Sequence, residues 1–280
     1  MADKAILYDA TRCTACRGCQ AACKQWNEND EVERAKPINR GSYENPPDLS
    51  PTAWLKIEFR EIENSGKMKW LFTRRSCLHC TDATCVLVCP NGSLRHNELG
   101  FVAFDQNTCT GCGYCVDFCP ARVPRLTRNS ITGQAKMDKC VFCSAPGLDR
   151  ITAGLEPACV KTCPTDALTY GDRAGLIAEG RKRVVVLKSK GNNNAYLYGD
   201  KELGGLHVIY VLDESPQTYG LPVNPQVPIA ATAWQSILKP AGLALGGLTL
   251  LGLGLNYIIA RKAKIAQELP GRKEKEYRGR

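Results

Sequence analysis

The 280-residue chain contains sixteen cysteines, which fall into four groups of four. The groups are Cys13-x2-Cys16-x2-Cys19-x3-Cys23, Cys77-x2-Cys80-x4-Cys85-x3-Cys89, Cys109-x2-Cys112-x2-Cys115-x3-Cys119 and Cys140-x2-Cys143-x15-Cys159-x3-Cys163. A proline follows the last cysteine of the second, third and fourth groups, whereas Lys24 stands there in the first. So many cysteines in a chain of this length indicate either a disulfide framework or bound metal, and their spacing decides between the two.

The spacing within the groups favours iron–sulfur clusters. Three cysteines within about seven residues allow a loop to hold three corners of a [4Fe–4S] cubane. The fourth cysteine, next to proline, is expected to start a helix or turn that points away, and so to bind the other cubane of a pair, as in two-cluster bacterial ferredoxins. Structural zinc sites use two separated Cys-x2-Cys pairs instead. Disulfides would suit an even number of cysteines in an exported protein, but Cys-x2-Cys neighbours are better placed as redox pairs than as staples.

The order of the groups predicts how the clusters pair. The second and third groups are contiguous and form an inner module of about 77–125, and the first and fourth groups, 13–23 and 140–163, form an outer module around it. Exchange of the fourth cysteine within each module predicts four sites. Site A comprises Cys13, Cys16, Cys19 and Cys163; site B, Cys140, Cys143, Cys159 and Cys23; site C, Cys77, Cys80, Cys85 and Cys119; and site D, Cys109, Cys112, Cys115 and Cys89.

Apolar alternation and turn residues predict a few regular elements between the cysteines. The predicted strands are 5–8, 101–104 and 206–212, with a hairpin over 52–74 that turns at Asn64-Ser65-Gly66. A helix capped by Asp172 is expected to run to about Lys190, with an apolar side made of Leu176, Ile177 and Val184–Val186. The proline-rich stretch 222–228 suits neither helix nor strand and is interpreted as part of a linker.

An uncharged stretch near the C-terminus indicates a membrane span. The 21 residues from Pro240 to Ala260 carry no charge, and as a helix they would extend about 31 Å, enough to cross the hydrocarbon core. The basic residues that follow, with Trp234 before the span and Tyr257 inside its far end, favour a membrane over a buried soluble helix. The excess of Lys/Arg after the span predicts a cytoplasmic C-terminus, with the cluster domain on the other side. The first residues do not form a signal peptide.

These patterns divide the chain into four predicted parts. They are a cluster domain (1–221), a linker (222–239), a transmembrane helix (240–260) and a basic cytoplasmic tail (261–280). The predicted fold class is α+β, with two ferredoxin-like two-cluster modules related by a pseudo-twofold axis and one C-terminal transmembrane helix. The net charge of +9 is concentrated in the tail, and the rest of the chain shows no basic stripe of the kind that binds nucleic acid.

The sequence contains no motif of a catalytic or nucleotide-binding site. His79 lies between two predicted ligands, so packing or tuning of the cluster is favoured over ligation, because cysteine already fills the site. The span 240–260 contains neither His nor Met and so cannot hold a haem of its own. A chain with four clusters and no substrate site is interpreted as an electron-transfer protein between two partners and not as an enzyme.

The four-group pattern resembles the iron–sulfur subunits of molybdopterin oxidoreductases, and in particular the β subunits of membrane-bound formate dehydrogenases of the N/O type. The supporting segments extend along the whole chain: Cys19–Trp26, Pro47–Ser50, Glu156–Pro164, Gly204–Leu212 and Trp234…Leu238-Lys-Pro240. Nitrate-reducing relatives replace one cysteine of the third group with Trp, whereas here Cys112 and its neighbours are all present. The N-terminus is shorter than in the family, leaving little before Ala5 to reach a partner.

The resemblance implies two protein partners: a catalytic α subunit with a molybdenum or tungsten bis-pterin cofactor, and a cytochrome b γ subunit. It implies a single-pass protein of the cell inner membrane with a periplasmic cluster domain. Electrons from formate would pass through the four clusters to the cytochrome and then to quinone. Two alternatives stay open: the same role beside a polysulfide or dimethyl sulfoxide reductase type of catalytic subunit, and a soluble polyferredoxin carrier.

Overall fold

The computed structural model describes residues 3–29, 43–64 and 66–277. It divides into two compact units, Met1–Ala231 and Thr232–Arg280, which are considered separately. The first unit contains all sixteen cysteines, a four-stranded sheet, three two-stranded ribbons and several short helices. The architecture is therefore mixed α and β, in agreement with the predicted class at this level.

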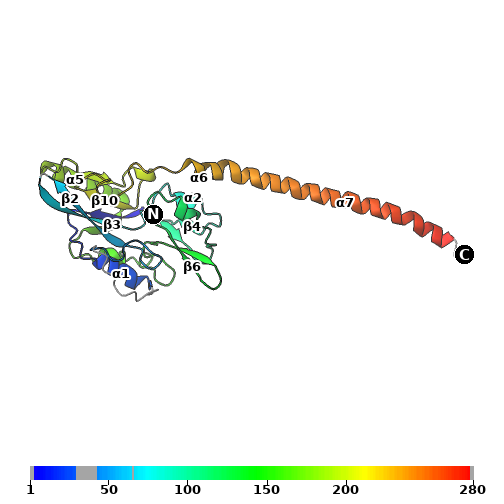
Figure 1. Ribbon diagram of the computed structural model, residues 1–280, viewed down its shortest axis with the longest axis horizontal. Helices are drawn as coiled ribbons and strands as arrows, with labels where there is room; N and C mark the ends of the chain where they lie inside the picture. The colour runs from blue at the N-terminus through cyan, green and yellow to red at the C-terminus, as the bar shows by residue number, and fades with distance from the viewer. Residues whose placement is uncertain (1–2, 30–42, 65, 278–280) are drawn as a thin grey trace. The chain divides into compact units, whose positions relative to one another are not determined.

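The four-stranded sheet joins parts of the chain that are far apart in sequence. Its strand order is β8 (Leu168–Asp172), β1 (Lys4–Asp9), β10 (Val208–Leu212) and β9 (Tyr196–Tyr198). Strand β1 pairs antiparallel with β8 and parallel with β10. Helix α5 (Arg173–Ser189) packs on β1 and β10, and Figure 1 shows it beside the latter. The predicted strands 5–8 and 206–212 are confirmed, and the latter begins two residues later, at Val208.

Helix α5 confirms the predicted helix, but its buried face differs in part from the prediction. Leu176 and Ile177 are buried as expected, whereas Val185 and Val186 are 66% and 41% exposed. Three consecutive residues on a helix point in directions about 100° apart, so Val184–Val186 cannot all face the sheet. Asp172 occupies the N-cap position without a capping hydrogen bond, because its carboxylate accepts a hydrogen bond from the Lys4 ammonium at 2.7 Å.

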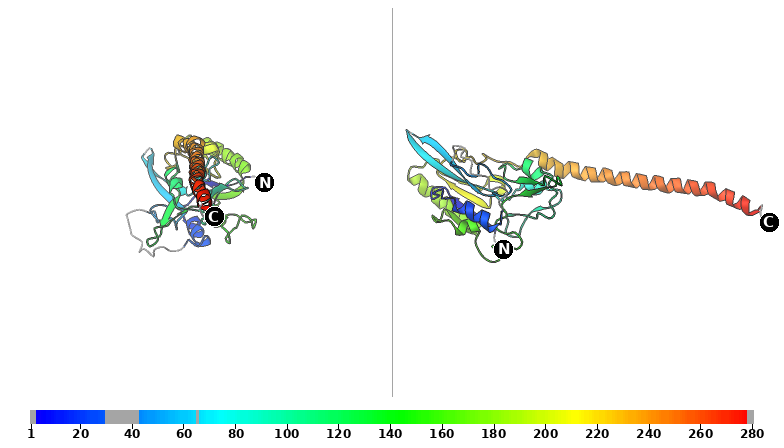
Figure 2. Two further views of the ribbon diagram at one scale, coloured as in Figure 1. Left: turned by 90° about the vertical axis from the view of Figure 1, so that its right-hand side faces the viewer. Right: turned by 60° about the horizontal axis from the view of Figure 1, so that its bottom comes forward.

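Three antiparallel ribbons complete the first unit. They are β2 (Lys56–Asn64) with β3 (Lys67–Arg75), β4 (Leu94–His96) with β5 (Val102–Phe104), and β6 (Arg125–Arg128) with β7 (Ala135–Asp138). Figure 2 shows the β2–β3 ribbon in pale blue at one end of this unit. The predicted hairpin over 52–74 and the predicted strand at 101–104 are thereby confirmed; residue 65 of the expected turn lies outside the described residues.

A short helix follows the first cysteines of every group. These helices are α1 (Gly18–Trp26), α2 (Thr84–Leu87), α3 (Tyr114–Asp117) and α4 (Ala158–Lys161). Each contains the third cysteine of its group, and in α2, α3 and α4 the fourth cysteine comes just after the helix ends. In these three groups the fourth cysteine is followed at once by a turn and not by a helix, so the turn is the one of the two predicted alternatives that occurs. Proline after that cysteine cannot continue a helix, whereas Lys24 allows α1 to run on to Trp26.

The second unit is a long helical segment. Residues 222–228 are irregular, as their prolines predict, but helix begins at Ile229, inside the stretch predicted as linker. The segment comprises α6 (Ile229–Ala233), the π-helical turn η2 (Trp234–Leu238) and α7 (Lys239–Tyr277). The part from Ile229 to Gln267 is long and apolar enough to cross a membrane. A short 3-10 turn, η1 (Glu202–Gly204), is the remaining helical element of the described residues.

Candidate metal centres

The four cysteine loops share one backbone geometry. The residue just before the second cysteine of each group has a left-handed conformation: Ala15 (φ 54°), His79 (φ 49°), Gly111 (φ 68°) and Phe142 (φ 62°). The backbone N–H groups of Ala15 and Gly111 each donate a hydrogen bond at 3.4 Å to the sulfur of the first cysteine in their group. The N–H groups of His79 and Phe142 lower the pKa of Cys77 and Cys140 in the same way. Left-handed residues turn successive N–H groups toward one point and so form an anion-binding concavity. Each loop is therefore shaped to hold negatively charged sulfur.

At the outer sites the structure brings together cysteines from the first and fourth groups. Burial raises the pKa of Cys13, and the nearby charges of Cys163 and Cys16 raise it further, against hydrogen bonds that lower it. Burial raises the pKa of Cys23 well above its usual value, and three thiolates add to this effect: Cys140, Cys159 and Cys143. Cys13 of the first group therefore lies near Cys163 of the fourth, and Cys23 lies near three cysteines of the fourth group.

The inner sites show the same exchange between the second and third groups. Burial raises the pKa of Cys80 well above its usual value, with further increases from the nearby charges of Cys77, Cys119 and Cys85. Burial raises the pKa of Cys115 to about 12, and three thiolates contribute: Cys112, Cys109 and Cys89. Cys119 and Cys89, the last cysteines of their groups, therefore each lie beside the first three cysteines of the other group.

Strand pairing explains why the cysteines meet in this way. Strand β1 ends just before the first group and β8 begins just after the fourth, and their antiparallel register places Tyr8 opposite Leu168. Helices α1 and α4 also pack against each other. The β4–β5 ribbon brings the second and third groups together in the same way. Leu94 follows the second group and lies opposite Phe104, which precedes the third, and α2 packs against α3.

The predicted sites can be arranged in a row, in the order A, B, C, D, in which successive sites have cysteines near each other. Cys19 of site A interacts with Cys159 of site B, and Cys140 of site B interacts with Cys77 of site C. Cys85 of site C in turn interacts with Cys115 of site D. The two cysteines that are exposed are Cys16 and Cys112, one at each end of the row. All four cysteines of site B are buried, site C combines the buried Cys77 with three partly buried cysteines, and each end of the row has one exposed cysteine.

The donor set fits iron–sulfur clusters. All sixteen cysteines are free thiols, so the structure contains no disulfide framework. Buried thiols with raised pKa values resist ionisation unless a cation compensates the thiolate charge, and iron supplies that compensation. No three His, Cys, Asp or Glu side chains among the described residues converge as they would on a single metal ion. A cubane takes one thiolate at each of four separate corners, so its ligands lie further apart than those of one ion.

His79 packs in the interior and is not placed as a ligand. Its ring lies 4.9 Å from the ring of Phe142 and 6.0 Å from that of Phe101, edge-on to both, and neither ring nitrogen has a hydrogen-bond partner. Burial lowers the pKa of His79 well below its usual value, so the ring is neutral. This placement fits the packing role predicted from the sequence.

Two buried cations near the sulfurs were not predicted as functional residues. They are Arg74, at the end of the predicted hairpin, and Lys139, directly before Cys140. Both side chains are 1% exposed. The sequence feature that indicates burial of Arg74 is its position in the strand. It lies on the side of β3 that alternation assigns to the core, directly opposite Ile57 of β2.

Gly111 offers a direct test of the loop geometry at site D. A Cβ atom there would lie 2.2 Å from the backbone oxygen of Ala135 at a φ of +68°. The left-handed backbone costs alanine about 1–2 kcal/mol, and displacing a packed neighbour adds about 1–3 kcal/mol. We expect Gly111→Ala to lose about a quarter of the iron of the protein, measured as iron per chain. Gly133→Ala is the matched control, because φ is +71° and the space is open; equal iron in both variants would contradict the prediction.

Comparison with known proteins agrees with this arrangement. The chain matches the 4Fe-4S dicluster domain family twice, over residues 68–173 and over residues 12–93. With sixteen cysteines, two dicluster domains fit four [4Fe–4S] clusters.

Three curated relatives are similar over most of the chain. The formate dehydrogenase iron-sulfur subunit of Haemophilus influenzae is 39% identical over 251 residues, covering 88% of this chain and 77% of the relative. The nitrate-inducible formate dehydrogenase iron-sulfur subunit of Escherichia coli is 38% identical, covering 92% and 85%. The formate dehydrogenase-O iron-sulfur subunit of the same organism is 40% identical, covering 84% and 76%. Identity of this extent, together with the four cysteine sites, establishes that the chain belongs to the iron–sulfur subunits of formate dehydrogenases, the electron-transfer subunits of those complexes.

Proposed function

We propose that this chain transfers electrons between two partner subunits. A molybdenum- or tungsten-containing catalytic subunit oxidises formate and supplies the electrons. A membrane cytochrome b receives them and passes them on to quinone. The observation that carries the proposal is the set of four sulfur sites, of which site B is buried and the two outermost are exposed at Cys16 and Cys112. Each [4Fe–4S] cluster, when bound, supplies a one-electron carrier. The relatives are named as subunits of formate dehydrogenases, which supports formate as the electron source.

The ligands at each site are part of this proposal. The four members of sites A, B, C and D each bind one cluster through their sulfurs, and the fourth ligand comes from the other group of the module. Neighbouring thiolates at Cys13, Cys23, Cys80 and Cys115 support these sets. The packing of α1 on α4 and of α2 on α3 supports two ferredoxin-like modules related by a pseudo-twofold axis. The loop N–H groups stabilise the bound sulfurs and orient them.

The direction of electron flow follows from the order of the sites and from the family resemblance. Sites A and B, the outer pair, face the catalytic subunit, and sites C and D, the inner pair, face the cytochrome. Electrons would enter near Cys16 and leave near Cys112, the exposed cysteine at each end. Each of the two sites in the middle of the row then accepts an electron from one neighbouring site and donates it to the next.

The helical segment gives the chain a place in the membrane. Its leucines are exposed along the span, for example Leu250 at 72% and Leu251 at 66%, and lipid would cover them. Gly242 and Gly246 lie one turn apart with open space around them, so a helix of the cytochrome could approach closely. We infer that residues 240–260 anchor the chain in the inner membrane beside that partner.

We further propose that the cluster domain lies on the periplasmic side and the tail on the cytoplasmic side, because basic residues follow the span. The domain would acquire its clusters in the cytoplasm and cross with a partner that carries a twin-arginine signal. We expect protease added to intact spheroplasts to cleave the cluster domain, detected by immunoblotting. In inverted vesicles, protease should reach only the tail after Arg261. Protection of the cluster domain in spheroplasts would reverse the orientation.

Iron content and reduction by formate test the function directly. The sixteen cysteines predict that this chain contributes about sixteen non-haem iron atoms, and as much acid-labile sulfide, to the anaerobically purified complex. Formate should reduce the clusters, observed as iron–sulfur signals in electron paramagnetic resonance (EPR) spectra. Bound zinc, or iron that reaches only half this amount, would contradict the cluster assignment. Clusters that stay oxidised with formate, but are reduced by another donor, would contradict formate as the electron source.

A further inference from the structure

Arg74 is a buried cation that faces sulfur. Its guanidinium Nη1 donates a hydrogen bond to the Ser76 hydroxyl, and its Nη2 lies 3.7 Å from the Sγ atom of Cys159. The Nε atom has no hydrogen-bond partner. The backbone carbonyl of Arg74 accepts a hydrogen bond from the Tyr210 hydroxyl at 2.9 Å, which helps to hold strand β3 in place. Within the described part of the chain, no carboxylate forms an ion pair with this guanidinium.

Lys139 occupies a similar position beside the inner module. Its Nζ atom donates hydrogen bonds to the backbone carbonyls of Val102 at 2.8 Å and of Cys140 at 3.0 Å. Carbonyl oxygens satisfy two of its three donors but do not neutralise its charge. The structure, over the residues that it describes, gives it no carboxylate partner either.

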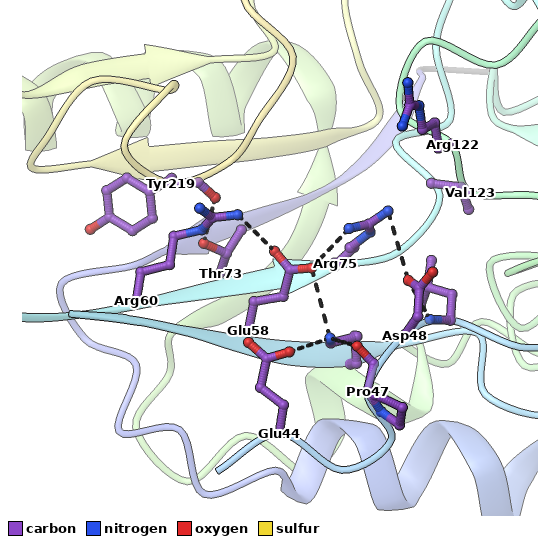
Figure 3. Close-up of polar contacts among 12 residues, drawn as sticks. Glu44, Pro47, Asp48, Glu58, Arg60, Thr73, Arg75, Arg122, Val123 and Tyr219 are labelled. Carbon is purple, nitrogen blue, oxygen red and sulfur yellow. Dashed lines mark hydrogen bonds and ion pairs between the residues drawn. The ribbon is translucent and has the colours of Figure 1, made fainter. Parts of the chain in front are cut away.

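Other cations of the β2–β3 ribbon are paired with carboxylates. Glu58 lies 2.9 Å from Arg75 and 3.6 Å from Arg60, as Figure 3 shows. Lys56, which is as buried as Arg74, pairs with Glu44 and lies 3.8 Å from Glu58. Successive strand residues point to opposite faces, so Arg75 meets these carboxylates on one face while Arg74 enters the core on the other. Arg74 therefore lacks a carboxylate partner because its side chain lies on the core face of the ribbon, whereas the carboxylates lie on the opposite face.

Sulfur is the anionic group beside Arg74, and Lys139 is held at the backbone carbonyl of Cys140, a cysteine of site B. Burial raises the pKa values of Cys159 and Cys140 in site B, and the Arg74 charge is the largest influence that opposes it. Burial likewise raises the pKa of Cys77 in site C, where Lys139 is the largest opposing influence. An unpaired buried charge is strongly unfavourable. The negative charge of sites B and C would compensate the two cations and so remove the cost of burying them.

We propose that Arg74 and Lys139 are fixed positive charges that raise the reduction potentials of the clusters at sites B and C, the two sites in the middle of the row. The inference rests on the proposed function, because it requires clusters at these sites. A cubane with four thiolate ligands is negative, and one arriving electron makes it more negative by one charge without a proton. Burial away from water opposes that increase, and a nearby cation favours it. The two residues thus keep the middle of the row accessible to electrons.

Neutral and charge-retaining substitutions separate charge from packing. The variants are Arg74→Gln, Lys139→Gln, Arg74→Lys and Lys139→Arg, with Arg181→Gln as a control because Arg181 is exposed and pairs with Asp200. Redox titration of the purified complex, followed by EPR, measures each cluster potential. We expect Arg74→Gln to lower the potential of one cluster, with at least a tenfold loss in its reduction equilibrium constant, about 59 mV for one electron. Lys139→Gln should lower a different one. The charge-retaining variants and the control should stay near the unsubstituted protein.

The possible outcomes are distinct. Unchanged potentials in both Gln variants, with all iron retained, overturn the inference and leave the proposed function standing. An equal shift in Arg74→Lys and Arg74→Gln also overturns it, because charge is then not the cause. If Arg74→Gln loses a cluster, retention of that cluster in Arg74→Lys supports charge compensation, and loss in both variants overturns it. Fewer than four clusters in the unsubstituted complex would instead contradict the proposed function itself.

Discussion

Replacement of Cys119 by alanine is expected to stop the passage of electrons from formate to quinone. Cys119 is the last cysteine of the third group, but its sulfur lies beside Cys80 and Cys77 of the second. Loss of this ligand should remove the cluster at site C, leaving a gap between sites B and D. Electron tunnelling decays steeply with distance, so formate-dependent quinone reduction should fall to background. Dye reduction at the catalytic subunit should continue, because it does not use the later sites.

Cys89→Ala is the matched variant for this experiment. Cys89 is the last cysteine of the second group, yet it lies beside the cysteines of the third. The Cys89→Ala substitution should therefore remove the EPR signal of site D and leave that of site C, the reverse of Cys119→Ala. If each variant instead removes the signal of its own group, the exchange of fourth ligands is wrong. If quinone reduction survives without site C, the row is not the path of the electrons.

The meeting of distant cysteines could be predicted from the sequence because each group is a local structure. The Cys-x2-Cys loop and the proline after the last cysteine are set by residues close in sequence, and the same loop geometry recurs in all four groups. The contiguity of the second and third groups then left the first and fourth to pair with each other. Strand β1 joins β8 as that pairing requires.

Other features depend on tertiary contacts that local patterns do not encode. The order of sites A to D follows from how the two modules pack, which spacing alone does not specify. Arg74 lies on the side of β3 that alternation assigns to the core, but no local pattern shows that its buried guanidinium meets sulfur. The valines of α5 were assigned to the buried face as a block, although helical periodicity exposes Val185 and Val186. Residues 229–239 are helical because the helix of the span continues back past Pro240 as far as Pro228, the last proline of the irregular stretch 222–228.

Two charges in the middle of the span are expected to release the chain from the membrane. Leu248 and Leu251 lie near the centre of the uncharged stretch, and both are exposed on α7. A lysine at the centre of a membrane helix costs about 2.5–3.5 kcal/mol. Two lysines therefore oppose insertion by about 5–7 kcal/mol, which corresponds to roughly four to five orders of magnitude in the partition equilibrium. We expect the Leu248→Lys, Leu251→Lys double variant, produced without its partners, to leave the carbonate-washed membrane fraction.

The double variant Leu248→Ala, Leu251→Ala controls for the loss of leucine side chains. It keeps the stretch uncharged, so it should stay in the membrane fraction, measured by immunoblotting of pellet and supernatant. Iron content should be the same in both double variants, because the cysteines all lie in the first compact unit and the span contributes no ligand. Retention of the lysine variant in the membrane would mean that surfaces other than residues 240–260 hold the chain there. Loss of iron together with membrane release would mean that the two units do not fold independently.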